Sequence, residues 1–400
     1  MSQEHKNDTA AAVQIERVDV LFGPRKMRKH ALQLLDEDSD RDQILEQTGM
    51  VLGVADASLS VPTGSISILM GLSGSGKSSL LRCINGLNPV TRGALTVSTN
   101  DGPVNVAVCK GRALRRLRRH SMAMVFQQFG LLPWATVKEN IGFGLSVRGE
   151  DKALIEERVQ EQLSLVGLEA WADKAISTLS GGMQQRVGLA RAFATDADIL
   201  LMDEPFSALD PLIRGHLQDE LLTLQARLKK TIVFVSHDLD EALKLGNQIS
   251  IMEGGRIVQT GTVDDIVFNP GNDYVRRFVA NINPLSVLKA GTIMRPVFIG
   301  PDEDISGEIS VAVGAVDRVL LKQGVPLAIK SAGRPYEVKI LDSHDQLDAL
   351  ADSVVCINEN TPVKWLLSRA ANSSLPTIVS DSAGRLAGVI DAQDICRALS

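Results

Sequence analysis

The segment Gly71-Leu-Ser-Gly-Ser-Gly-Lys-Ser78 decides the fold of this chain. It follows the apolar run Ile66–Met70 and precedes a helical pattern over 77–87, so we expect a strand, a glycine-rich loop and a helix. Glycines let successive backbone N–H groups turn toward one point, and the helix adds the positive end of its dipole. This combination is typical of a loop that binds the phosphates of a nucleotide; a plain glycine turn before a helix is the alternative.

The residues of this loop are expected to share the work of holding a nucleotide. Lys77 should reach the β- and γ-phosphates, and the Ser78 hydroxyl should bind Mg²⁺. The remaining loop residues that we expect beside the phosphates are Gly71, Ser73, Gly74, Ser75, Gly76 and Ser79.

A second motif, Ile199-Leu-Leu-Met-Asp-Glu204, is an apolar run that ends in two carboxylates. A buried strand of this kind brings its last residues to the carboxyl edge of a parallel sheet, where nucleotide sites lie. Asp203 suits the shell of a Mg²⁺ ion, and Glu204 suits a general base that acts on the attacking water. An acidic N-cap of a following helix is the alternative interpretation.

Composition limits the remaining possibilities. The chain has 400 residues, a formal net charge of −6 and four widely spaced cysteines. This length predicts two or three domains, and the composition excludes a wholly disordered, collagen-like or disulfide-stapled chain. Residues 1–13 lack the apolar core of a signal peptide, and no run of about 18 apolar residues predicts a membrane span. The acidic balance argues against binding of nucleic acid.

Hydrophobic patterns divide the chain into parts. Residues 1–12 are expected to be a disordered polar tail, and 13–280 an α/β domain in which strands and helices alternate. Within it, 24–50 is expected to be an insertion containing a short helix capped by Ser39, and 54–61 and 65–70 a pair of strands. Shorter apolar runs predict a second, smaller α/β domain over 285–400.

A third motif, Leu179-Ser-Gly-Gly-Met-Gln-Gln-Arg186, supplies a serine cap and two glycines at a helix start. Along the chain it stands between Gln127 and the strand that ends in Glu204, and Asp210 and His237 follow that strand. With the phosphate loop, this ordered series resembles the full motif set of ATP-binding-cassette (ABC) ATPases over roughly 52–265. The resemblance implies a P-loop NTPase fold that binds and hydrolyses ATP with Mg²⁺.

That resemblance also implies a head-to-tail homodimer with two ATP molecules at the interface. Each ATP would lie between the loop 71–79 of one subunit and the third motif of the other. The residues that would act there are Gln127 on Mg²⁺ and water, His237 on the γ-phosphate, Asp210 across the interface, and Ser180, Gly181, Gly182 and Gln184 on the nucleotide. Phe22 stands where the family keeps an aromatic ring against adenine; a core or strand-end phenylalanine is the alternative.

Three stretches resemble one branch of that family, the quaternary-amine importers of bacteria. They are the insertion with its Gln43-Ile-Leu-Glu-Gln-Thr-Gly49, the segment Ala208–Arg214, and Asn272-Asp-Tyr-Val-Arg276. Such proteins power uptake of glycine betaine, choline or proline betaine with membrane permease subunits and a substrate-binding protein. The resemblance therefore implies a peripheral protein at the cytoplasmic face of the plasma membrane.

The tail partly resembles a pair of cystathionine-β-synthase (CBS) modules, with Gly291–Pro296 at the start of the first and Thr361–Asp394 in the second. This implies a regulatory or dimerisation role, and a structural clamp between subunits is the alternative. Asp391 stands where the family has Ser or Thr near a ribose, and an acid there would repel phosphates.

Two other functional classes are weighed against an importer subunit. A soluble ABC ATPase acting on DNA or ribosomes usually has two cassettes or a long coiled coil, whereas this chain has one phosphate loop and no sustained heptads. A regulatory cassette without hydrolysis is disfavoured because Glu204 and His237 are both present. The basic run Arg112–His120 is interpreted as a solvated or lipid-proximal face and not as a nucleic-acid site.

Overall fold

The computed structural model describes residues 11–280, 288–297, 307–313, 316–331, 333–341, 350 and 352–399. It divides the chain into two compact units, Met1–Ala280 and Asn281–Ser400. The first strand begins at Ala11, so the last two residues of the expected tail are part of the fold. The rest of that tail, residues 1–10, and residues 285–287 at the start of the expected second domain lie outside the described residues.

The centre of the first unit is a six-stranded sheet of order β10-β9-β3-β8-β7-β6. Five of its strands run parallel, and β10 is antiparallel to β9. Every residue of β3, β7 and β8 is buried, which explains their continuous apolar sequences. The strands are β3 (Ile66–Met70), β6 (Met122–Val125), β7 (Ile199–Asp203), β8 (Thr231–Val235), β9 (Gln248–Glu253) and β10 (Arg256–Gly261).

A second sheet has the order β2-β1-β4-β5 and is antiparallel. Its strands are β1 (Ala11–Phe22), β2 (Val51–Pro62), β4 (Arg92–Thr99) and β5 (Gly102–Asn105). The expected pairing of 54–61 with 65–70 was wrong, because β2 pairs with β1 while β3 enters the six-stranded sheet. Every residue of β3 is buried, so both faces of this strand must be covered, and strands inside a parallel α/β sheet are covered in this way.

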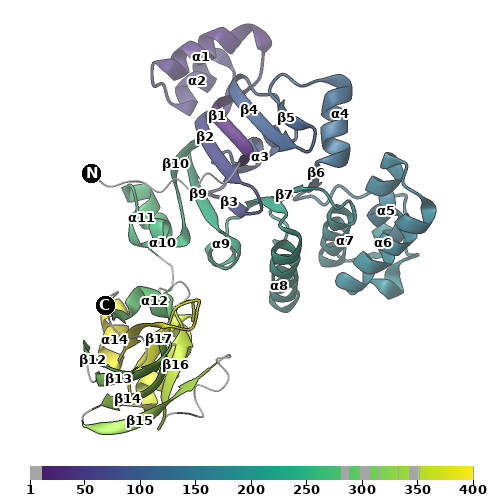
Figure 1. Ribbon diagram of the computed structural model, residues 1–400. Coiled ribbons are helices and arrows are strands. Elements are labelled where there is room, and N and C mark those ends of the chain that lie inside the picture. Colours follow the sequence, from purple (N-terminus) through teal and green to yellow (C-terminus); the bar gives the residue numbers. More distant parts are fainter. Residues whose placement is uncertain are drawn as a thin grey trace. The chain divides into compact units, whose positions relative to one another are not determined.

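Helices surround these sheets, and Figure 1 shows α5 and α6 grouped beside α7 on one side of the unit. Residues of α5, α6 and α7 join the strands of the six-stranded sheet in one apolar core that includes Ile141, Leu163 and Leu189. The helices are α3 (Lys77–Ile84), α4 (Gly111–His120), α5 (Val137–Arg148), α6 (Lys152–Leu165), α7 (Gly181–Ala194), α8 (Pro211–Leu228), α9 (Leu239–Leu245), α10 (Val263–Phe268) and α11 (Asp273–Val279).

The stretch 24–50 lies between β1 and β2 and forms two helices, α1 (Arg28–Asp36) and α2 (Arg41–Thr48). The expected cap of the second helix was placed one residue too early: Asp40, not Ser39, is the N-cap. Asp40 accepts a hydrogen bond from the backbone N–H of Gln43, whose side chain bonds back to the N–H of Asp40. Only the residue three positions before Gln43 can close this reciprocal box.

The second unit is built on an eight-stranded sheet of order β11-β18-β17-β16-β15-β14-β13-β12. One part is an antiparallel meander, β12 to β15, and the rest contains the parallel neighbours β15, β16 and β17. The strands are β11 (Arg295–Pro296), β12 (Gly307–Val313), β13 (Val316–Lys322), β14 (Val325–Ser331), β15 (Arg334–Ile340), β16 (Val354–Asn358), β17 (Thr377–Ser380) and β18 (Leu386–Ile390), with α12 (Ala290–Ile293), α13 (Leu366–Asn372) and α14 (Ala392–Leu399).

In the part of the chain that the structure describes, no helix combines the length and the apolar character needed to cross a membrane.

Candidate nucleotide site

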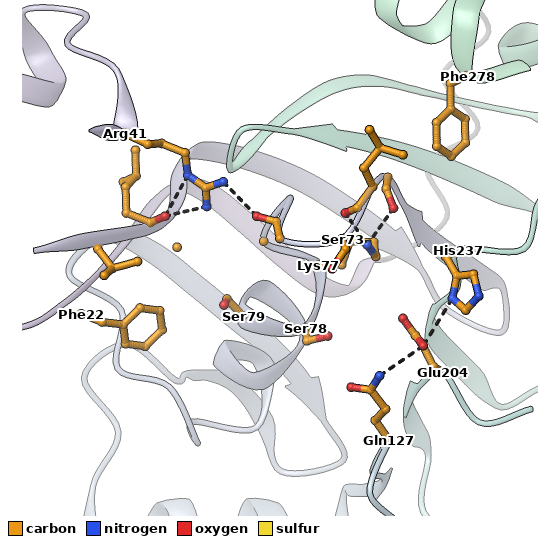
Figure 2. A pocket seen from close by; sticks show the side chains of 17 residues that line it. Phe22, Arg41, Ser73, Lys77, Ser78, Ser79, Gln127, Glu204, His237 and Phe278 are labelled. Atoms are coloured by element: carbon orange, nitrogen blue, oxygen red, sulfur yellow. Dashed lines mark hydrogen bonds and ion pairs between the residues drawn. The ribbon is translucent and has the colours of Figure 1, made fainter. Parts of the chain in front are cut away.

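A cavity of about 790 Å³ opens at the carboxyl ends of the parallel strands. The glycine-rich loop after β3 forms its floor, and Gln127, Glu204 and His237 enter it from the ends of β6, β7 and β8 (Figure 2). Phe22, at the end of β1, lies on the opposite side from these three. The topology therefore brings eight separate segments of the chain to one site, since Arg41, residues 51–53 and Phe278 line it too.

Close backbone packing explains two glycines of the loop. A Cβ atom on Gly71 would lie 2.2 Å from the carbonyl oxygen of Met252, and one on Gly76 would lie 2.3 Å from that of Gly53. Both glycines also have positive φ angles, +142° and +102°. The loop is thus pressed against β9 and β2, and only glycine fits at these two positions.

Lys77 folds back over the loop and donates hydrogen bonds to the carbonyl oxygens of Gly71, at 2.7 Å, and Leu72, at 2.9 Å. Burial lowers the pKa of Lys77 below its ordinary value of 10.5, while the nearby charges of Glu204 and Asp203 act in the opposite direction. A buried ammonium next to a loop of backbone amides favours an anion with several oxygens.

The fully buried carboxylate of Asp203 has partners on both oxygens. The Ser78 hydroxyl donates to Oδ1 at 2.6 Å, and Arg82 of α3 donates to Oδ2 at 3.0 Å. Hydroxyl and carboxylate oxygens are ligands that suit Mg²⁺. Among the described residues no cluster of three or more His, Cys, Asp or Glu could hold a metal ion.

Glu204 connects the other polar groups of the cavity. Its Oε2 accepts a hydrogen bond from Gln127 Nε2 at 3.3 Å and lies 3.3 Å from His237 Nδ1. Figure 2 shows Gln127 and His237 approaching this carboxylate from two sides. The Glu204 side chain is 17% exposed and that of His237 is 62% exposed. The arrangement places one carboxylate and one imidazole beside the phosphate loop.

Several residues that we expected at the nucleotide do not line this cavity. Ser75 is buried, and its Oγ has no hydrogen-bond partner. Ser180 caps α7 by accepting from the N–H of Met183, and Asp210 caps α8 by accepting from that of Ile213. Gln184 of α7 donates to the carbonyl oxygens of Ile176 and Leu179, which precede this helix. Gly181 and Gly182, like these residues, are absent from the lining of the cavity.

The sequence analysis missed six lining residues, of which Arg41 and Phe278 come from segments that it did not connect with the site. Arg41 comes from the insertion and lies above Phe22 in Figure 2. Phe278 of α11 enters from the far end of the unit, and its ring stacks on Tyr274, whose hydroxyl accepts from the N–H of Leu72 at 3.4 Å. A basic residue at the start of a capped helix was visible in the sequence, but nothing local indicated that either segment returns to the loop.

In the second unit, Asp391 is paired with a cation. Arg295 contacts Asp391 and lies 3.0 Å from Asp394. Burial by itself would raise the pKa of Asp391, but the backbone N–H of Asp394 and the Arg295 charge hold it below the usual value. The acid that we expected to repel phosphates therefore has a cationic partner inside its own unit, which it shares with Asp394.

Basic residues of α4 have protein partners. Arg118 donates to the carbonyl oxygens of Asn85, at 2.7 Å, and Gly86, at 2.8 Å, and Arg116 pairs with Asp101 at 2.7 Å. The other arginines of the run, Arg112, Arg115 and Arg119, are at least partly exposed. This distribution agrees with a solvated face.

Comparison with known proteins identifies the family. A family model described as "ABC transporter" matches residues 54–207, and one described as "CBS domain" matches residues 348–400. The solved dimeric structure of the ATP-binding cassette MJ0796 in a post-hydrolysis state, bound to ADP and phosphate, is 27% identical. It aligns with a TM-score of 0.53 and covers 63% of this chain and 98% of its own. The expected P-loop fold is thus confirmed. Of the expected pair of CBS modules, the family model matches one, over residues 348–400.

Relatives extend over nearly the whole chain. The glycine betaine/proline betaine transport system ATP-binding protein ProV of Escherichia coli (strain K12) is 40% identical, with 98% of each chain covered. The glycine betaine/carnitine transport ATP-binding protein GbuA of Listeria monocytogenes serotype 1/2a (strain 10403S) is 39% identical, with 97% of each covered. This chain therefore belongs to the ABC transporter ATPases, in the family of ATP-binding subunits of betaine and related quaternary-amine importers.

Proposed function

We propose that this protein hydrolyses ATP in the cavity at 71–79 to power import of glycine betaine or a related quaternary amine such as choline or proline betaine. The observation that carries the hydrolytic step is the convergence of Gln127 and His237 on the Glu204 carboxylate beside Lys77. The alternative, a DNA- or ribosome-related ATPase, is not supported, because the full-length relatives are transport ATP-binding proteins.

Each polar group in the cavity has a task in phosphoryl transfer. Glu204 takes the proton of the attacking water: its carboxylate is partly shielded, and Gln127 and His237 hold it in position. Lys77 neutralises charge on the β- and γ-phosphates, and His237 donates to the γ-phosphate. Bound Mg²⁺, held by Ser78, Gln127 and through Asp203, would neutralise charge between these phosphates. Phe22 lies at the far side and packs on the adenine.

Two copies of the chain are proposed to complete each site. Ser180 and Gly181 are exposed at the N-terminus of α7, outside the cavity of their own subunit. A helix start with free backbone N–H groups binds phosphate oxygens well. In a head-to-tail homodimer, Ser180, Gly181 and Gly182 of one chain would face the γ-phosphate held by the other, with Gln184 supporting that loop and Asp210 at the interface. The dimeric state of the MJ0796 cassette supports this arrangement.

The transporter partners follow from the same proposal. The dimer binds integral-membrane permease subunits at the cytoplasmic face of the plasma membrane, and a substrate-binding protein delivers the amine to that permease. Closure of the dimer on ATP and its opening after hydrolysis would drive the permease. The names of the relatives, which are transport-system ATP-binding proteins, support this assembly.

A replacement of the proposed base that keeps its shape and removes its charge tests the hydrolytic proposal. In Glu204→Gln the shape of the side chain is kept but the proton acceptor is lost, so we expect a fall in kcat of about 100-fold or more. The variant should also trap an ATP-bound dimer that light scattering detects. Wild-type turnover in Glu204→Gln would rule out this residue as the base. Uptake of labelled glycine betaine, choline and proline betaine by cells expressing the complete transporter then identifies the amine.

A further inference from the structure

The insertion between β1 and β2 sends one side chain, Arg41, to the nucleotide cavity. We propose that Arg41 is a positioning residue that sets the backbone of the phosphate loop for the β- and γ-phosphates. The inference rests on nucleotide binding in the proposed function and adds a role for the insertion to the same site.

Three hydrogen bonds from one guanidinium carry the proposal. Nη1 of Arg41 donates to the carbonyl oxygen of Gly74 at 2.8 Å, while Nε and Nη2 donate to that of Leu52 at 3.0 and 2.6 Å. Figure 2 shows this fork spanning the gap between the phosphate loop and the start of β2. Arg41 thus ties the exposed tip of the loop to the strand beneath it.

The bond to Gly74 reaches Lys77 through the backbone. The carbonyl of Gly74 and the N–H of Ser75 belong to one planar trans peptide, so fixing one fixes the direction of the other. That N–H donates to the carbonyl oxygen of Leu72 at 3.2 Å, and the same oxygen accepts a hydrogen bond from Lys77 Nζ at 2.9 Å. Arg41 therefore holds the turn against which the Lys77 ammonium rests.

The insertion is built to hold Arg41 still. Arg41 is the first residue of α2, directly after the Asp40 capping box. Ile44 is fully buried in a small apolar core shared with β1 and β2, and the buried Thr48 hydroxyl accepts from the N–H of Met50. Outside this core, Arg92 bridges Asp19 of β1 and Asp36 of α1. A helix fixed at both ends can place a side chain within the tolerance that a phosphate site needs.

This role predicts that loss of Arg41 affects the binding of some nucleotides and not of others. In the proposed function the turn 72–77 holds the β- and γ-phosphates, so loss of Arg41 should weaken ATP and ADP similarly. AMP lacks both phosphates and should bind as before. An arginine that instead touched the base or ribose would weaken all three nucleotides alike.

The test compares Arg41→Met and Arg41→Lys with the control Lys29→Met, which removes an exposed charge from the same insertion. Titrations with fluorescent ATP, ADP and AMP analogues give the dissociation constants. We expect Arg41→Met to weaken ATP and ADP about tenfold, Arg41→Lys to weaken them less, and Lys29→Met to have no effect. The KM for ATP should rise while kcat changes less than about twofold.

A readout without nucleotide separates positioning from general loss of structure. Amide hydrogen exchange in the peptide that spans 72–77 should accelerate in Arg41→Met, whereas exchange in α3 and β3 should not. Unchanged exchange and unchanged affinities, or an equal loss for AMP, would overturn the proposal. Failure of the Glu204→Gln experiment with a preserved Arg41 effect would refute the hydrolytic mechanism and leave this inference standing.

Discussion

Glu204 adopts a left-handed backbone conformation, with φ of +49°, directly after the buried strand β7. Its carbonyl oxygen accepts hydrogen bonds from Gln185 Nε2 at 3.3 Å and from the Ser207 hydroxyl at 3.0 Å. Gln185 lies in α7, whose start carries Ser180, and its Oε1 accepts from the N–H of Ala208. The backbone of the proposed base is thus connected to the helix that would contact the second subunit.

Lys77 allows a prediction of pH dependence at the same scale. Burial lowers the pKa of Lys77 from 10.5, and only the charged ammonium attracts phosphate. ATP affinity should therefore be constant near neutral pH and should fall, as the pH rises, in a range below 10.5. Titrations with a fluorescent ATP analogue at pH values from 7 to 10 measure this fall in affinity. The Lys77→Arg variant keeps its positive charge over this pH range, so its affinity for ATP should not change. An identical decline of affinity in both proteins would show that another group titrates.

At the scale of elements, Asn140 holds the segment between Gln127 and α5. This side chain is fully buried; its Oδ1 accepts from the N–H of Leu132 at 2.7 Å, and its Nδ2 donates to the carbonyl oxygens of Leu132 and Thr136 at 3.2 and 2.9 Å. Replacing it by leucine leaves the N–H of Leu132 without its partner, while the carbonyl oxygens of Leu132 and Thr136 lose one of two donors.

We expect Asn140→Leu to lower the free energy of unfolding by about 2–4 kcal/mol. Denaturant unfolding measures this, and exchange of the Leu132 amide should become faster than in wild type. The matched control is Gln128→Ala, an exposed residue of the same segment, whose stability should change by less than about 0.5 kcal/mol. Equal stability of Asn140→Leu and wild type would show that the segment is held by other contacts.

The sequence-based analysis succeeded where the signal was local. The strand, loop and helix around 71–78 and the class of the fold were predicted because glycine spacing and apolar runs are local properties. The family was recognised from the resemblance of an ordered series of motifs. It failed where two distant segments meet. The sheet that residues 65–70 join could not be read from these residues alone, because it depends on where a strand is covered on both faces. Phe278 reaches the cavity because α11 packs on the loop through Tyr274. Ser39 and Asp40 are both suitable N-cap residues, and only Asp40 exchanges hydrogen bonds with Gln43. The pattern of residue types does not distinguish the two positions.

At the scale of the molecule, the two units have separate cores. Ile329, Val354 and Val389 pack within the second unit. Among the residues that the structure describes, the apolar clusters of the first unit contain none beyond Val279. A chain ending at Ala280 should therefore fold and keep its ATP affinity within about twofold. If the tail is regulatory or dimerising, the salt dependence of ATPase activity or the nucleotide-dependent dimerisation should change. Activity against ionic strength and light scattering test this, and unchanged values in both would remove that role.

The exposed start of α7 has a consequence for the rate law. If residues of a second chain complete each site, hydrolysis by free protein grows with the square of its concentration, and specific activity falls on dilution. Two copies bound side by side on a permease would instead meet at a high effective concentration. Unassembled chains would then consume almost no ATP, so that a cell producing this subunit in excess over its permease would lose little energy to idle turnover.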